Sequence, residues 1–197
     1  MKITPLRILI ILTGFVLFLT FAVYSFKKEM SRPKLPELNF VRQFELTDSA
    51  GKTFNSGELK GKAWIADFFF TTCADVCPMM TKHMAQLSRT FEAVKGVHFV
   101  SISVNPEHDS PEVLSKYAQK LNVPLDQWHF LTGERETITK LMTEDFKIGS
   151  KEEPIFHSTF FVLVDRNSYI RGYYDGTQKP SIEKLFKDVA RLLKERS

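Results

Sequence analysis

The hydrophobic and polar positions divide the chain into a first apolar stretch and a longer region of alternating strand and helix patterns. Residues 8–26 contain no charged side chain, and a helix of that length spans about 28 Å, close to the hydrocarbon thickness of a bilayer. Because no small-x-small cleavage site follows, the pattern favours an uncleaved transmembrane anchor over a signal sequence. We therefore expect an anchor over residues 1–27, an extended tether over 28–39 and one domain over 40–197.

The domain has the pattern of an α/β fold. Residues 63–70 form a nearly continuous apolar run, which is typical of a central strand covered on both faces. An amphipathic helix is predicted over residues 78–94. Further expected elements are a hairpin over 41–54, strands over 97–104, 128–131, 159–164 and 169–174, and helices over 111–122, 134–146 and from 181. Because a polar turn joins the last two strands, they pair antiparallel, and the sheet is mixed.

The charge of the chain is concentrated at its start. The full sequence carries 27 Lys and Arg against 23 Asp and Glu, but residues 1–34 hold six of the cations and one of the acids. The domain itself is therefore close to neutral, which disfavours nucleic acid as a partner and points to membrane proximity. Cations flank both ends of the apolar run, so charge alone does not fix the orientation of the anchor.

Both cysteines of the chain, Cys73 and Cys77, lie between the buried strand and the helix expected from Pro78. A helix start gathers unpaired N–H groups and the positive end of the helix dipole, which stabilise a thiolate. If the segment winds as a helical turn, the i and i+4 sulfurs share a face and can close a disulfide or hold one soft metal ion. This placement favours a reactive pair over two packing residues.

A metal site with two thiolates needs a third ligand, and the sequence favours His157, directly before the strand over 159–164. A surface or hydrogen-bonded role is the alternative for this histidine. His83 is expected off the face of the cysteine pair and in solvent. The weaker candidates are His98, His108 and His129. Two sulfurs and one imidazole form a soft donor set that suits copper and lacks the four ligands of structural zinc.

Three other side chains near the cysteines are open to two interpretations. Met80 and Met84 fit the buried stripe of the helix, so we interpret them as packing residues rather than thioether ligands. Asp67 places a charge inside the central strand. A buried carboxyl there has a raised pKa and accepts a proton from a thiol, or it is a structural carboxylate bonded to nearby backbone.

Three segments in order, FFFTTCADVCP, SVNPEHDSPEVLSKYAQKL and FHSTFFVLVD, resemble the Sco/SenC family of thioredoxin-fold copper chaperones. The family assists assembly of the copper centre of cytochrome c oxidase. The resemblance implies a thioredoxin-like sandwich, copper held by Cys73, Cys77 and His157, and a redox disulfide between the cysteines. It also implies the copper-bearing oxidase subunit and a thiol reductant as partners, and a domain that faces the periplasm or exterior from the inner membrane. Asn105 departs from the aspartate common in the family.

Two function classes follow from these residues. The first is a membrane-anchored copper-binding assembly factor that is not an enzyme. The second is an extracytoplasmic thiol-disulfide oxidoreductase that keeps the cysteines of the oxidase copper site reduced. Such enzymes ordinarily separate their cysteines by two residues and place a proline before the later strand, whereas this chain has three residues between the cysteines and no proline at that place. The sequence therefore favours the first class.

Overall fold

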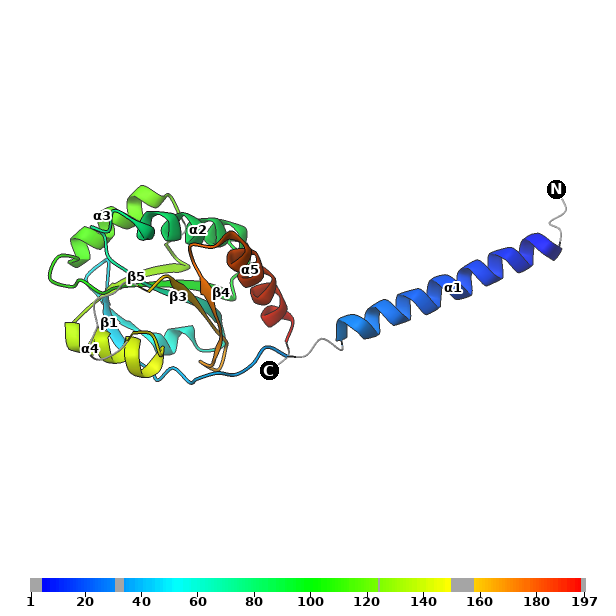
Figure 1. Cartoon of the computed structure of the whole chain (residues 1–197), viewed down its shortest axis with the longest axis horizontal. Helices are drawn as coiled ribbons and strands as arrows, with labels where there is room; N and C mark the ends of the chain where they lie inside the picture. Colours follow the sequence, from blue (N-terminus) through cyan, green and yellow to red (C-terminus); the bar gives the residue numbers. More distant parts are fainter. Residues whose placement is uncertain (1–4, 31–33, 124, 150–157, 196–197) are drawn as a thin grey trace. The chain divides into compact units, whose positions relative to one another are not determined.

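The computed structural model describes residues 5–30, 34–123, 125–149 and 158–195 (Figure 1), without the side chains of residues 5–10 and 25–30. The chain forms two compact units, Met1–Lys34 and Leu35–Ser197. The first unit contains helix α1 (Pro5–Met30), so the uncharged stretch is helical as expected. Over the described residues, no helix is both long enough and apolar enough to cross a membrane.

The second unit is built on one seven-stranded sheet with the strand order β2-β1-β5-β4-β3-β6-β7. Its strands are β1 (Glu45–Asp48), β2 (Thr53–Asn55), β3 (Ala63–Phe69), β4 (Val97–Ser103), β5 (Trp128–Thr132), β6 (Phe160–Val164) and β7 (Ile170–Asp175). The central strands β3, β4 and β5 pair parallel, and all other pairings are antiparallel. The mixed sheet and the N-terminal hairpin predicted from the sequence are confirmed.

Helices cover both faces of the sheet. The helical elements are η1 (Ser56–Leu59), α2 (Val76–Thr90), α3 (Pro111–Leu121), α4 (Arg135–Lys140), η2 (Leu141–Asp145) and α5 (Lys179–Lys194). Helices α2, α3 and α5 lie on one face and α4 lies on the other (Figure 1). Two starts differ from expectation, because α2 and α5 each begin two residues earlier than predicted. The helix expected over 134–146 is divided, since its second half forms the π-helical turn η2.

The two faces of β3 belong to two separate cores. Every residue of this strand is buried, and alternate side chains point to opposite sides of the sheet. Ile65 packs in the cluster that contains Met80 and Met84 of α2. Trp64 packs in the cluster on the other face, together with Phe146. The two methionines are 2% and 0% exposed, which confirms that they are packing residues.

A buried ion-pair network, which we name the Arg171 clamp, fastens the start of the domain to its end. The Arg171 guanidinium donates to Asp165 Oδ2 at 2.8 Å and to Glu195 Oε2 at 2.9 Å. It also donates to the carbonyl oxygens of Leu35 and Pro36, at 2.5 and 3.0 Å. Because Arg171 is only 5% exposed, these contacts replace the water that it loses. The compact unit therefore begins five residues earlier than the sequence predicts.

Candidate functional site

The cysteine pair lies in the connection from the central strand β3 to helix α2. Cys77 is the second residue of α2 and is 3% exposed, whereas the half-buried Cys73 precedes the helix. The backbone N–H of Cys73 closes a turn on the carbonyl oxygen of Phe70 at 3.3 Å. Both thiols are free, and they are hydrogen-bonded to each other. The sulfurs therefore meet as predicted, although a loop followed by the helix start brings them together rather than a full helical turn.

The environment separates the acidities of the two thiols. Burial alone would raise the pKa of Cys73, but hydrogen bonds from the Cys77 thiol and from the N–H groups of Cys77, Asp75 and Val76 hold it below its usual value. Burial and the hydrogen bond to Cys73 raise the pKa of Cys77 to about 12. Cys73 is therefore the better thiolate, and Cys77 is the buried thiol that donates a hydrogen bond to it.

Asp109 holds the start of the cysteine loop in place. Its carboxylate is fully buried and accepts hydrogen bonds from the Thr71 N–H at 3.0 Å and the Thr71 hydroxyl at 2.5 Å. The Ser103 hydroxyl donates to it at 2.6 Å, and Nδ1 of His108 lies 2.9 Å away. We name these residues the Asp109 network. Nothing local in the sequence indicates that Asp109 bonds to a residue 38 positions away.

Asp67 lies on β3 and is 2% exposed. Its carboxyl accepts a hydrogen bond from Ser101 at 2.5 Å, and that hydroxyl in turn accepts one from the Trp128 indole at 2.9 Å. Burial raises the pKa of Asp67 to about 7, as the sequence predicts for a buried carboxyl. The charge of the ionised form raises the pKa of Cys77 further. The carboxyl is thus part of the electrostatic environment of the cysteine pair.

The third predicted ligand, His157, lies outside the described residues. The structure describes the chain again from Ser158, which is 7% exposed and accepts a hydrogen bond from the N–H of Phe160 at 3.0 Å. Because β6 pairs antiparallel with β3, its first residues lie at the sheet end where β3 leads into the cysteine loop. Over the described residues, no three His, Cys, Asp or Glu side chains are grouped to hold a metal ion. The three-ligand site stays a prediction.

The other histidines have partners of their own. His83 is half-buried, with Nδ1 2.7 Å from the carbonyl oxygen of Gly176, so its predicted exposure to solvent is wrong. Because a carbonyl only accepts, Nδ1 must carry the proton. His98 Nδ1 lies 3.4 Å from His129 Nε2, and the ring planes differ by 4°. His108 contacts the buried Asp109. These contacts agree with the low rank that the sequence gives all four as ligands.

Comparison with known proteins identifies the relationship. The SCO1/SenC family model matches residues 32–194. A SCO1/SenC family lipoprotein from Bacillus anthracis is 36% identical, with a TM-score of 0.73, over 82% of this chain and 100% of that one. BsSco, a member of the Sco family of cytochrome c oxidase assembly proteins in which a disulfide switch was identified, is 33% identical, with a TM-score of 0.71, over 83% and 99%. Bradyrhizobium japonicum ScoI, solved with copper bound, is 25% identical, with a TM-score of 0.63, over 78% and 99%.

The sheet, its helical layers and the cysteine pair after the central strand define a thioredoxin-like protein of the Sco type. This chain belongs to the SCO1/SenC family.

Proposed function

We propose that this chain is a membrane-anchored copper chaperone that assists assembly of the copper centre of cytochrome c oxidase. The copper-bearing subunit of the oxidase is the acceptor of the metal. The match to the SCO1/SenC family over residues 32–194 supports this function. So do two relatives that span nearly their whole length on this chain, one from a family of oxidase assembly proteins and one solved with copper bound.

The observation that carries the proposal is the cysteine pair at the start of α2. Cys73 and Cys77 supply two sulfur donors already in contact, and the lowered pKa of Cys73 favours the thiolate that a metal requires. His157 is the third ligand in this proposal. A soft donor set of this kind suits copper. Because only three protein ligands hold the cargo, an incoming ligand from the acceptor has room to bind before one of them leaves.

Copper titration of the reduced full-length protein in detergent, without oxygen, tests the ligand set. We expect one copper ion per chain, and a loss of affinity of at least about tenfold in each of Cys73→Ser, Cys77→Ser and His157→Ala. His83→Gln is the matched control, because His83 is bonded to Gly176 and is not a proposed ligand. Unchanged affinity and absorption spectrum in His157→Ala would show that the third ligand is wrong.

A second activity, thiol-disulfide exchange, is favoured by the unequal acidity of the two thiols. In such a step the Cys73 thiolate attacks a disulfide of the oxidase subunit, and one substrate sulfur leaves as a thiolate that takes up a proton. Cys77 then loses its proton and attacks Cys73 in the mixed disulfide, which releases the second substrate sulfur as a thiol. The substrate gains two electrons and two protons, the chain holds a Cys73–Cys77 disulfide, and an external thiol reductant restores it.

Stoichiometry separates the two activities. Mixing the reduced protein with the oxidised soluble domain of the oxidase subunit, without copper, reports the exchange as one disulfide transferred per chain. Cys73→Ser removes the attacking sulfur and should abolish the transfer, whereas Cys77→Ser should trap the mixed disulfide. Transfer without copper binding in the titration above would make the oxidoreductase the primary function.

We also propose that residues 1–27 anchor the chain in the cytoplasmic membrane, with the domain outside the cytoplasm. Support comes from the absence of charge over residues 8–26 and from the helix α1. Both cysteines of this chain lie in the domain, so a lipid-modified cysteine beside the first helix is not its means of attachment. Alkaline carbonate should leave the protein in the membrane pellet, and protease added to spheroplasts should digest the domain. Protection of the domain would reverse the proposed orientation.

A further inference from the structure

A groove outside the cysteine site runs between α2 and α5, and we name it the α2–α5 groove. The two helices lie side by side (Figure 1). They run in the same direction, because His83 contacts Gly176 just before α5 begins, and the rings of Phe91 and Phe186 lie 5.2 Å apart further along. The groove between them has a volume of about 480 Å³. That is within the range of ordinary binding sites.

The floor of this groove is apolar. It is formed by Leu87 of α2 with Ile182 and Phe186 of α5. Leu87 is 3% exposed and belongs to the core, whereas Phe186 leaves 39% of its surface exposed. Isolated exposed apolar side chains are common on soluble proteins, but here one lies in a concave strip that continues into the core. A strip of this kind gains stability when apolar side chains of a partner cover it.

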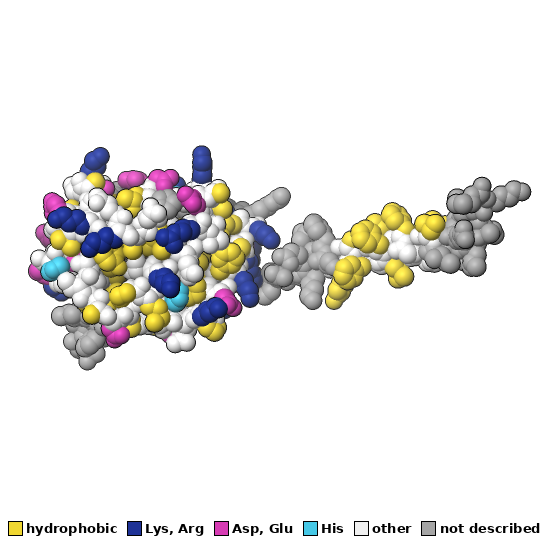
Figure 2. All heavy atoms as spheres, turned by 90° about the horizontal axis from the view of Figure 1, so that it is seen from above, with side chains coloured by type: hydrophobic (Ala, Val, Ile, Leu, Met, Phe, Trp, Pro, Cys, Tyr) yellow, Lys and Arg dark blue, Asp and Glu magenta, His cyan; other side chains and the backbone are white. Residues whose placement is uncertain are grey.

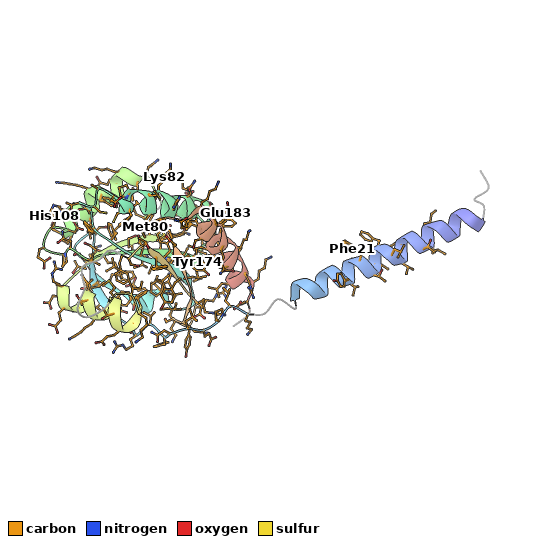
Figure 3. The ribbon with its side chains drawn as sticks, viewed as in Figure 1. Phe21, Met80, Lys82, His108, Tyr174 and Glu183 are labelled. Carbon is orange, nitrogen blue, oxygen red and sulfur yellow. The ribbon has the colours of Figure 1, made fainter. Side chains whose placement is uncertain are left out.

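Charged side chains border both ends of the floor. Lys82 and Lys179 lie at the end near Gly176, and Lys187 lies two helical turns along α5, about 12 Å from Lys179. Glu183 lies between them on α5, and Figure 3 shows it and Lys82 on the two neighbouring helices. None of these four forms an ion pair with another described residue. Figure 2, seen from the side of α2 and α3, shows lysine and arginine side chains among apolar patches on this face.

We propose that the α2–α5 groove docks an acidic amphipathic helix of a partner protein. Its apolar face would cover Leu87, Ile182 and Phe186, and a carboxylate at each end would pair with the lysines there. Cations at both ends favour a segment with two separated carboxylates over an amphiphile with a single head group. A recessed floor favours an inserted helix over a lipid surface, which protruding apolar side chains engage better.

The groove lies close to the cysteine loop. Cys77 precedes Lys82 by five residues of α2, which is about 8 Å along the helix axis. Gly176 lies near both the groove and the cysteine loop. Its carbonyl oxygen contacts His83 of the groove, and a Cβ at this glycine would lie 3.0 Å from Cε of the buried Met80, three residues after Cys77. A partner seated in the groove is therefore held beside the reactive pair. The docking itself does not depend on copper, so it stands or falls separately from the proposed function.

Peptide binding to the full-length protein in phosphatidylcholine nanodiscs tests the groove. The probe is a fluorescent helical peptide with leucine and phenylalanine along one face and a glutamate at each end of that face. The matched peptide has lysine in place of both glutamates. We expect the acidic peptide to bind at least tenfold tighter than the basic one, and Lys82→Glu with Lys187→Glu to weaken it at least tenfold. Lys120→Glu, on the exposed face of α3, should change it less than twofold.

Two further measurements complete the test. Methyl chemical-shift changes should be confined to Leu87 and Ile182 and their neighbours, and thermal unfolding of the double variant should match that of the unmodified protein. Equal binding of the two peptides, or binding that the double variant retains, would overturn the proposal. Loss of peptide binding in nanodiscs that contain phosphatidylglycerol would also overturn it, because the groove would then be occupied by lipid.

Discussion

The Arg171 clamp and the cysteine site lie at opposite ends of the same sheet. They differ in whether their buried carboxyl and thiol groups have a cationic partner. Val164 pairs with both Trp64 at the start of β3 and Ile170 before the clamp arginine, whereas the cysteine loop follows the last residue of β3. In the clamp, every carboxylate faces the guanidinium. At the other end, no described cation contacts Asp67 or either thiol, and burial raises the pKa of Asp67 and Cys77.

This difference gives the Arg171 clamp a structural role and the cysteine site a chemical one. Burial alone would lower the pKa of Arg171, but hydrogen bonds and ion pairs with Asp165 and Glu195 raise it, so the cation stays charged and holds the chain in place. Asp67 and the Cys77 thiol lack such a cationic partner, so the protonation of Asp67 changes near physiological pH and that of Cys77 on contact with a metal or disulfide.

Breaking the clamp should have the largest effect on stability. Arg171→Met leaves the buried Asp165 and the partly buried Glu195 without their cation, and we expect a loss of about 3–5 kcal/mol in the free energy of unfolding by urea. Arg135→Met is the matched control, because Arg135 pairs with Glu107 at the surface and its loss should cost less than about 1 kcal/mol. Equal effects of the two substitutions would show that burial does not set the strength of the clamp.

Asp67 should make stability fall as pH rises. Its pKa is raised from 3.8 to about 7 in the fold, so the folded state holds a proton that the unfolded chain has already lost between these values. We expect Asp67→Asn to gain stability relative to the unmodified protein from pH 4 to pH 7, by up to about 4 kcal/mol. Urea unfolding across this range measures the difference. A difference in unfolding free energy that stays constant from pH 4 to pH 7 would show that the pKa of Asp67 does not change on folding across this range.

The two thiols should differ in reactivity. Cys73 is half-buried with a lowered pKa, and Cys77 is buried with a raised one. At pH 7 and limiting iodoacetamide, we expect Cys73 to be modified at least about 100-fold faster than Cys77. Peptide mass spectrometry of the reduced native protein measures the ratio, and the same reaction in urea, where the ratio should approach one, is its control. Equal rates in the native protein would contradict the assignment of Cys73 as the thiolate.

The Asp109 network should contribute the smallest of these effects. Asp109→Asn weakens the bonds to Thr71 and Ser103, and we expect a loss of about 2 kcal/mol at pH 7. Burial raises the pKa of Asp109, but these hydrogen bonds outweigh it and hold the pKa below its usual value. The contribution is therefore present above about pH 4 and is lost as pH falls below it, where the two proteins should converge in urea unfolding. A difference that persists at low pH would indicate a steric effect.

Much of the fold could be predicted because its signals are local. The apolar run of β3, the stripe of α2 that contains Met80 and Met84, and the polar turn between β6 and β7 each reveal an element within about fifteen residues. The position of the cysteine pair between strand and helix was predictable in the same way. Element ends were less accurate, since the first turn of α2 contains Val76 and Cys77, whose side chains give no start signal.

The parts that could not be predicted depend on distant pairs. Arg171 contacts Leu35 across 136 positions, and Thr71 contacts Asp109 across 38. His83 faces a glycine carbonyl 93 positions later. The hydrophobic periodicity of the sequence does not reveal such contacts, because each of these polar residues is of a type that is usually exposed to solvent.

The place where the domain begins also has a geometric consequence. Because the Arg171 clamp lies at one end of β3 and Cys73 follows the other end, the attachment point and the reactive pair are separated by about 23 Å of strand. In the proposed anchored state, a partner therefore meets the reactive pair about 23 Å from the start of the domain rather than beside it.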